Sequence, residues 1–147
     1  MISRPLRTGD WPRVDWLASN EVQEGDHTTF GTEWGQNRRE FTRENAHSVV
    51  EVDGIVVAYS SIECEADKGW RAFIVLDWSK QDDEVQEAAY NALEGLIAER
   101  LATSVWMREL ADDHALLKFI EQKGFEVERR YEFSGFEMVN LRKSYAA

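Results

Sequence analysis

The clearest hydrophobic pattern in the chain runs from Trp70 to Leu101, and the other segments can be arranged around it. A run of β-forming residues at 72–76 is followed by a polar, acidic stretch and then by apolar residues that recur at helical spacing. We therefore predict a strand, a loop and a helix with one face packed on a sheet. The predicted buried stripe of this helix consists of Val85, Ala89, Ala92, Leu96 and Ile97.

A strand that leads directly into a helix creates a potential binding site. The first turn of the helix has free N–H groups and the positive end of the helix dipole, and both then point to the carboxyl end of the strand. Proteins commonly hold a phosphate group at such a place. The segment that follows Leu76 is therefore the first candidate for a functional site.

The N-terminal part of the chain predicts a strand and a helix. We expect the strand over Ile2–Arg7 and the helix from about Trp11 to Asn20. Asp10 precedes the helix and is a residue type that caps helices well, because its carboxylate can accept hydrogen bonds from the first free N–H groups.

The next segment, 21–34, contains two glycines and has no sustained period. One interpretation is a loop that folds over a pocket, since long loops often carry function. The other is that Phe30 and Trp34 pack under the sheet, and the sequence favours neither. A polar second helix is expected over 36–45.

A hairpin follows, marked by Asp53 and Gly54 between two β-branched runs. This dipeptide favours a type I′ turn, because both central positions need φ > 0. The second arm begins at Ile55 and continues to about Cys64. We expect the Cys64 side chain to be buried rather than reactive, and a lone cysteine, which forms no internal disulfide, agrees with a reducing compartment.

The C-terminal third predicts a strand, a helix and two more strands. The segment 104–108 reads as a short buried strand, and residues 112–113 would cap an amphipathic helix that ends at Gly124. The remaining residues alternate well enough for two strands, which would be joined near 129–130 or near 134–135.

The amino-acid composition limits the classes of protein to which the chain can belong. The 147 residues, 43% of them apolar, are enough for one domain, 1–147, with an ordinary core. No run approaches the roughly 18 apolar residues of a membrane span. The first residues also lack the apolar core of a signal peptide. We therefore expect a cytoplasmic protein with no membrane partner.

Charge narrows the choice of ligands. The formal net charge of −11 repels phosphate backbones, so nucleic acid is not expected as a partner, whereas amine-bearing small molecules suit the negative field. His27, His47 and His114 lie far apart and lack Cys/His ligand spacing, so the sequence predicts no metal site.

The predicted order of elements resembles that of the GCN5-related N-acetyltransferase (GNAT) superfamily. The match in residues is best at 112–125, a short helix that ends in Gly124-Phe125, while 52–59 is similar to the family's second hairpin and 6–11 to its opening. The resemblance covers nearly the whole chain and is nearest to one half of bacterial proteins that carry two such domains in tandem. It implies an α+β fold with a twisted, mixed sheet of about seven strands and four helices.

The family's signature after the fourth strand is Gln or Arg, two residues, Gly, one residue, and then Gly or Ala. Its backbone N–H groups cradle the pyrophosphate of acetyl-CoA, and its small residues let the backbone approach closely. In this chain Gln81 is present, but Glu84 and Gln86 fill the small positions. The cofactor-binding positions that the resemblance implies are Leu76, Gln81, Asp82, Asp83, Glu84, Val85 and Gln86.

Three adjacent acids, 82–84, make this segment unfavourable for a diphosphate. One carboxylate about 6 Å from a phosphate oxygen, at an effective dielectric constant of about 20, repels it by roughly 2 to 3 kcal/mol, which is tenfold or more in affinity. The same acids also stabilise a helix start, by about 0.3 to 1 kcal/mol each. Both interpretations are compatible, because a helix end neutralised by its own carboxylates has less need of a foreign anion.

The sequence gives only weak candidates for catalytic residues. Family members often use a tyrosine shortly before the Gly-Phe ending as the general acid toward the departing thiolate, but Ile120 occupies that place and cannot donate a proton. Tyr131 is near in sequence, although we expect it on a strand. The candidate bases for an amine substrate are Glu63, Glu65 and Asp77, and a solvated strand residue is the simpler interpretation of each.

Three functions remain open from the sequence. The first is an acetyl-CoA-dependent N-acetyltransferase that acts on a small amine. The second is a catalytically silent domain of the same fold, which binds acetyl-CoA weakly or not at all and has a second copy or a tandem domain as its partner. The third is a small-molecule binder that uses a cleft under Phe30 and Trp34 without acyl transfer. The acidic segment and Ile120 favour the second.

Overall fold

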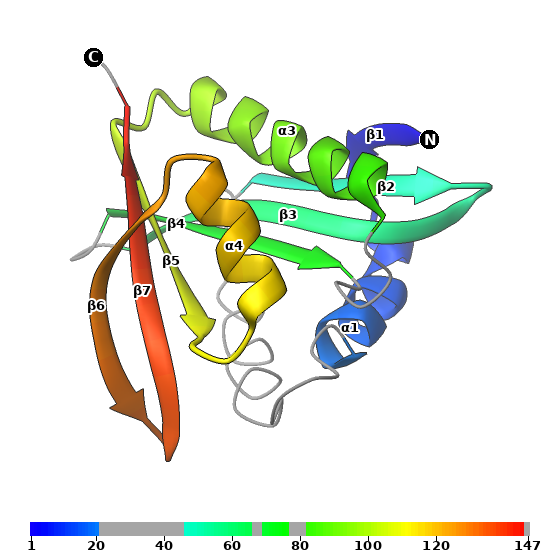
Figure 1. Cartoon of the computed structure of the whole chain (residues 1–147). Coiled ribbons are helices and arrows are strands. Elements are labelled where there is room, and N and C mark those ends of the chain that lie inside the picture. Colours follow the sequence, from blue (N-terminus) through cyan, green and yellow to red (C-terminus); the bar gives the residue numbers. More distant parts are fainter. Residues whose placement is uncertain (21–45, 66–68, 77–81, 146–147) are drawn as a thin grey trace.

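The structure is a computed structural model, and it describes residues 1–20, 46–65, 69–76 and 82–145 (Figure 1). These residues form an α+β fold in which helices pack on a seven-stranded mixed sheet. The predicted fold class and the predicted sheet of about seven strands are confirmed. The predicted helix at 36–45 and the two interpretations of the segment 21–34 lie outside the described residues.

The described elements have the following bounds. The strands are β1 (Ile2–Pro5), β2 (Ala46–Val52), β3 (Ile55–Glu65), β4 (Gly69–Leu76), β5 (Ser104–Leu110), β6 (Glu126–Phe133) and β7 (Phe136–Ser144). The helices are the 3₁₀ turn η1 (Thr8–Asp10), α1 (Trp11–Asn20), α3 (Asp83–Glu99) and α4 (His114–Gln122).

The strands follow the order β1-β2-β3-β4-β5-β7-β6 across the sheet. β4 and β5 are parallel, with α3 as the crossover, and the other described neighbours are antiparallel. The parallel pair is short, because only Trp70 with Val105 and Arg71 with Trp106 are in register. Beyond these two pairs the strands diverge, and α4 lies over the space between them (Figure 1).

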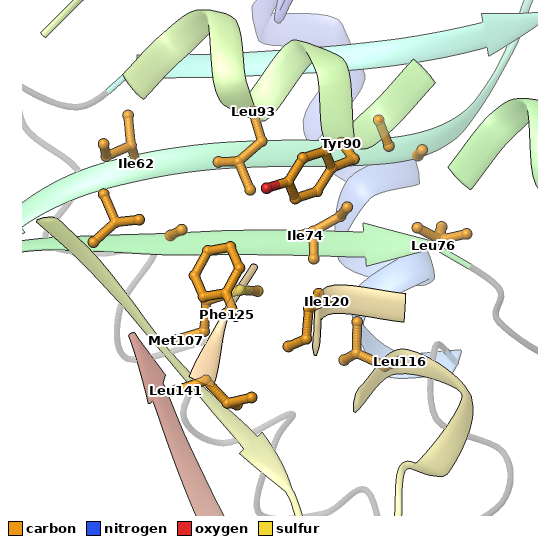
Figure 2. Packing of buried hydrophobic residues seen from close by; sticks show 14 of the residues in the cluster. Ile62, Ile74, Leu76, Tyr90, Leu93, Met107, Leu116, Ile120, Phe125 and Leu141 are labelled. Atoms are coloured by element: carbon orange, nitrogen blue, oxygen red, sulfur yellow. The ribbon is translucent and has the colours of Figure 1, made fainter. Parts of the chain in front are cut away.

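The two faces of the sheet are covered by different helices. α3 contacts β2, β3 and β4, and α1 contacts β3 and β4 from the other side. Neighbouring residues of one strand therefore enter different clusters: Val50 and Ile74 belong to the core under α3 and α4, whereas Val49 and Val75 pack with α1. Figure 2 shows the first cluster, in which Phe125 and residues of α4 lie beside Ile74 and side chains of β5 and β7.

The stripe predicted for α3 is partly wrong. Val85, Ala89 and Ile97 are buried as predicted, but Ala92 and Leu96 are only half-buried. The helix instead buries Gln86, Tyr90 and Leu93, so its covered face is turned toward α4 as well as the sheet.

Turn geometry follows the local sequence closely. Asp53 and Gly54 have φ of 52° and 79°, which confirms the type I′ hairpin. Of the two predicted joints between the last strands, the one at Ser134 and Gly135 is correct, with φ of 52° and 83°. The joint predicted near 129–130 is wrong: the strand continues there, with a register shift between Val127 and Arg129.

Two N-terminal details differ from the prediction. β1 ends at Pro5, two residues before the predicted strand end. The Asp10 carboxylate accepts a hydrogen bond from the Arg7 N–H at 2.7 Å, so it caps η1 rather than α1. Arg4 donates to the same carboxylate at 2.8 and 3.0 Å and to Glu51 at 3.1 Å, which ties the start of the chain to β2.

Cys64 is exposed, so the prediction of a buried thiol is wrong. It pairs with Trp70 near the end of β3, two residues beyond the fully buried Ile62. Within the described part of the chain, none of the helices combines the length and apolar character needed to cross a membrane.

Candidate functional site

The candidate site lies at the start of α3, on the side of this helix that faces α4. β4 ends at Leu76 and α3 begins at Asp83, which agrees with the predicted order of strand and helix. The connecting residues 77–81, including the predicted candidates Asp77 and Gln81, lie outside the described residues. The site is therefore built from Leu76, from 82–86 and from α4.

Asp82 is the N-cap of α3. Its carboxylate Oδ1 accepts a hydrogen bond from the Val85 N–H at 3.2 Å, and its carbonyl oxygen accepts one from the Gln86 N–H at 3.0 Å. Asp83 and Glu84 follow in the first turn, and both are exposed. The chain thus places its own negative charge at the positive end of this helix dipole, which stabilises the helix.

A groove of about 620 Å³ opens between α3 and α4 beside this helix start. α3 contributes Asp83, Gln86 and Glu87 to its wall, and α4 contributes the opposite side. The residues of α4 that line it are His114, Ala115, Lys118, Phe119 and Gln122.

Charge in this groove is divided between its walls. The α3 wall carries the carboxylates of Asp83 and Glu87, and the α4 wall carries the ammonium of Lys118. Glu87 also pairs with Lys123, whose Nζ lies 2.7 Å from both carboxylate oxygens. The same ammonium lies 5.3 Å from the ring centroid of Phe119, so an aromatic ring and a carboxylate together surround a cation at the edge of the groove.

The described residues of this turn do not fit a diphosphate. The N–H group of Val85, which a phosphate oxygen would need, already donates to Asp82. Asp83 and Glu84 add two exposed carboxylates at the same place. Gln86, at the position where the family signature has a small residue, carries a side chain that reaches the groove.

The predicted catalytic positions do not form one constellation. Ile120 is fully buried in the core and has no proton to give. Tyr131 lies on β6, as predicted, and its hydroxyl donates to Asn140 Oδ1 at 2.7 Å. Glu63 lies on β3, with β4, β5 and β7 between it and β6, so the two candidates are not neighbours in the sheet.

Glu63 is not the solvated residue that its position in the sequence favours, because only 7% of it is exposed. It pairs in register with Arg71, which is 4% exposed. The backbone of Glu65 ends β3, and its side chain lies outside the described residues. Asp77 is likewise undescribed, so neither is placed as a base.

An array of arginine and aromatic side chains, not predicted from the sequence, lies on the sheet face opposite α3. The guanidinium carbon of Arg71 lies 4.5 Å from the ring centroid of Phe73 and 4.9 Å from that of Trp106. That of Arg108 lies 5.1 Å from the ring of Phe133. The signal was the spacing of two residues between Arg71 and Phe73, and between Trp106 and Arg108, which puts each pair on one face of a strand.

A second group that the sequence does not predict connects α3 with the C-terminal end of β7. Lys143 Nζ donates to Glu94 Oε1 at 2.8 Å and to the Tyr90 hydroxyl at 2.9 Å. The hydroxyls of Tyr90 and Tyr145 also donate to Glu94. Burial opposes ionisation of Glu94, but these hydrogen bonds outweigh it and lower the pKa of its carboxyl. The group lies outside the groove and ties the two elements together.

The fold of this chain matches that of solved N-acetyltransferases, among them structures described as GCN5-related. The crystal structure of the ribosomal-protein-alanine N-acetyltransferase of Brucella melitensis superposes on this chain with a TM-score of 0.74 and 16% sequence identity. The match covers 98% of this chain and 99% of that chain. That of the ribosomal-protein-S18-alanine N-acetyltransferase of Escherichia coli superposes with a TM-score of 0.74 and 15% sequence identity. This match covers 99% of this chain and 94% of that chain.

A third similar structure is that of yncA from Salmonella typhimurium, described as an acetyltransferase with its cofactor acetyl-CoA. Its TM-score is 0.71 at 12% identity, over 99% of this chain and 94% of that chain. A scan against models of protein families and a search of curated proteins both find no match. At these identities the likeness establishes the fold, and the chemistry has to be argued from the residues.

Proposed function

We propose that this chain is a GNAT-fold domain that does not hold acetyl-CoA in the first turn of α3 and that acts by binding rather than by acyl transfer. The observation that carries the proposal is the hydrogen bond from the Val85 N–H to the Asp82 carboxylate. It occupies a backbone donor and puts a negative charge where a phosphate would have to lie.

Electrostatics support the same conclusion. Asp82, Asp83 and Glu84 stand in or next to the first turn of α3. A single carboxylate about 6 Å from a phosphate oxygen costs roughly 2 to 3 kcal/mol at an effective dielectric constant of about 20. Three carboxylates exceed what Lys118, on the opposite wall of the groove, can offset.

The absence of a proton donor at residue 120 agrees with a silent domain. Ile120 packs in the hydrophobic core, and its side chain has no group that could donate a proton. We propose a second copy of this chain or a tandem domain as the partner of such a module. A cytoplasmic location fits its one cysteine, which is exposed and would be kept reduced there.

The second candidate is an active acetyl-CoA-dependent N-acetyltransferase that acts on a small amine. The divergence of β4 from β5 favours it, since the backbone architecture of the fold is retained. In that case Lys118 and the segment before Asp82 would have to compensate for the acids of the first turn.

Calorimetric titration with acetyl-CoA separates the two candidates. We expect no binding heat from the natural chain and a gain of binding in the triple variant Asp82→Asn, Asp83→Asn, Glu84→Gln. These substitutions remove three charges but keep the size of each side chain, and Asn still caps a helix. A matched control is the triple variant Glu99→Gln, Glu126→Gln, Glu132→Gln, which removes three exposed charges elsewhere.

Heat from the natural chain, or turnover of any amine with acetyl-CoA, would overturn the proposal. A gain of binding in both triple variants would show a general effect of net charge rather than an effect of the α3 turn.

A further inference from the structure

We propose that two copies of this chain associate through the outer edges of their β6 strands, which pair antiparallel and join the two sheets into one. A second copy is one of the two partners named in the proposed function, on which this inference rests. β6 is the last strand in the order of the described sheet and lies at its outer side (Figure 1). One edge of β6 pairs with β7, and no strand of the described chain lies beside the other edge.

Side-chain exposure shows that this edge is open. Of the eight residues Glu126–Phe133, Tyr131 is half-buried and the others are exposed. Two of the exposed side chains are apolar, since Val127 is 39% and Phe133 41% exposed. An edge strand presents a row of backbone N–H and C=O groups that can pair with another strand. β6 can therefore accept a strand from another molecule.

The other end of the described sheet is less suited to such pairing. β1 has four residues, and its last residue, Pro5, lacks the N–H group that a new strand would need. β6 is twice as long and contains no proline. Its register with β7 shifts between Val127 and Arg129, but from there to Phe133 the pairing is regular. Residues 129–133 therefore offer a regular edge.

The sequence of residues 129–133, Arg-Arg-Tyr-Glu-Phe, is complementary to itself in an antiparallel pair. When Tyr131 faces Tyr131 of a second copy across a two-fold axis, Arg130 lies opposite Glu132 twice. In the same register Arg129 lies opposite Phe133 twice. Pairs of opposite charge and pairs of a cation with an aromatic ring stabilise neighbouring strands. This register therefore favours a second copy of the chain as the partner.

Other registers are less favourable. A two-fold axis at Arg129, Arg130 or Glu132 would bring two like charges face to face. Like charges directly opposite each other destabilise a pair of strands. An axis at Phe133 would leave most of the strand unpaired, because the strand ends there. Charge and strand length together therefore select the register centred on Tyr131.

The charges that the dimer would pair are available in the single copy. Arg130 and Glu132 are both exposed. The described ion pairs of β6 involve only Glu128, which pairs with Arg142 of β7. Association would therefore form two Arg–Glu contacts without breaking a described ion pair.

The same edge offers aromatic rings to the second copy. The guanidinium carbon of Arg129 lies 4.8 Å from the ring centroid of Tyr131, so the cation lies on the face of the sheet that carries the rings. On this face the guanidinium carbon of Arg108 lies 5.1 Å from the Phe133 ring. In the dimer the exposed part of the Phe133 ring would meet Arg129 of the second copy, so that each ring contacts two cations.

A contact of one strand edge per copy is small for a permanent dimer. Specific stable interfaces bury about 1,200 to 2,000 Å², and smaller ones are typical of transient association. The net charge of −11 on each copy also opposes the approach. We therefore expect a reversible dimer, with a dissociation constant on the order of 10 µM at about 150 mM salt.

Sedimentation velocity of the natural chain from about 2 to 500 µM measures this association. We expect the weight-average mass to rise with concentration from 17.0 kDa toward twice that value. Glu132→Arg puts an arginine opposite Arg130 at two places, so it should weaken dimerisation by at least about tenfold. The substitution removes one negative charge and adds one positive charge, which changes the net charge from −11 to −9. Weaker general repulsion would predict tighter association instead.

A charge exchange tests the register itself. Arg130→Glu should weaken the homodimer as Glu132→Arg does, because glutamates then face each other. When the two variants are mixed in equal amounts, they should associate, because each glutamate of one chain faces an arginine of the other. The control Glu99→Arg makes the same charge change at an exposed position of α3, and it should not weaken the dimer. Circular dichroism and thermal unfolding check that each variant is folded.

Three results would each overturn the inference: a natural chain that stays monomeric at about 500 µM, an equal loss of association in Glu132→Arg and Glu99→Arg, or no association between the two mixed variants. Titration of the same samples with acetyl-CoA tests the proposed function separately. A monomer that gives no binding heat would overturn this inference and leave a tandem domain as the proposed partner. A dimer that gives binding heat would overturn the proposed function and leave the β6 interface in place.

Discussion

The Nδ1 atom of His47 lies 2.7 Å from the hydroxyl oxygen of Tyr59, and the two rings stack with 5.9 Å between their centroids. His47 lies on β2 and Tyr59, which is fully buried, on β3. The Trp11 ring lies nearly perpendicular to that of His47, with 5.4 Å between the two centroids. Burial lowers the pKa of His47 from its usual 6.5 to about 4, so the ring is neutral in the folded protein at neutral pH.

This cluster predicts that stability falls in mild acid. Between pH 6.5 and 4, His47 is protonated in the unfolded chain but neutral in the folded chain. The free energy of unfolding therefore decreases as the pH falls through this window. With allowance for partial solvent screening, we expect a loss of about 1 kcal/mol between pH 7.5 and 5.5, where ordinary carboxylates stay ionised. Urea unfolding at several pH values measures it.

Two variants test the assignment of this pH dependence. His47→Gln should flatten the curve above pH 5.5, because it removes the titrating ring. His114→Gln, at an exposed position, should leave the slope unchanged. An unaltered slope in His47→Gln would assign the effect to another group.

The cap of α3 should contribute to stability as well as to ligand choice. Asp82→Ala removes the acceptor of the Val85 N–H, and we expect it to lower the free energy of unfolding by about 1 kcal/mol. Asp82→Asn should cost less, because an amide oxygen still accepts the bond. Chemical denaturation of the two variants measures the difference. Equal stability of the Ala variant and the natural chain would contradict a capping role.

Glu94 is expected to stabilise the junction between α3 and the end of β7. Glu94→Gln leaves Lys143 partly buried without its counter-charge and weakens the hydrogen bonds of Tyr90 and Tyr145. The loss should be about 1 to 2 kcal/mol in denaturant unfolding. Glu99→Gln, at an exposed position of the same helix, should change stability by less than about 0.5 kcal/mol. Similar losses in both would mean that the network adds nothing.

The thiol of Cys64 should be open to reagents in the folded protein. Because the residue is exposed, we expect one adduct per chain from a thiol-specific reagent, at a rate close to that of the denatured chain. Mass spectrometry counts the adducts, and the far-ultraviolet circular dichroism should not change. Strong protection in the folded state would indicate that another part of the protein covers this thiol.

Features set by local chemistry could be predicted from the sequence. Asp53-Gly54 and Ser134-Gly135 demand left-handed backbone, and Gly124 follows α4 with φ of 100°. The short pairing of β4 with β5 could not be predicted, because the sequence of neither strand shows how far two parallel strands pair.

Features set by tertiary contacts could not be predicted in this way. A single helical period predicts one buried stripe for α3, but the helix faces the sheet and α4 together, so Tyr90 and Leu93 replace Ala92 and Leu96 in the core. The burial of Glu63 could not be predicted either, because the burial of a strand residue depends on what covers its face of the sheet. The groove beside Gln86 is formed by the packing of α3 beside α4. The spacing of residues along the chain does not show how two helices pack.

The short pairing of β4 with β5 has a consequence for how this architecture survives sequence change. The far ends of the two strands are spaced by apolar side chains such as Ile74, Met107 and Ile120, all of them inside the molecule. None of the three belongs to the acidic turn before α3. Substitutions in the turn therefore leave these apolar contacts in place, so the spacing of the two strands does not depend on which residues the turn carries.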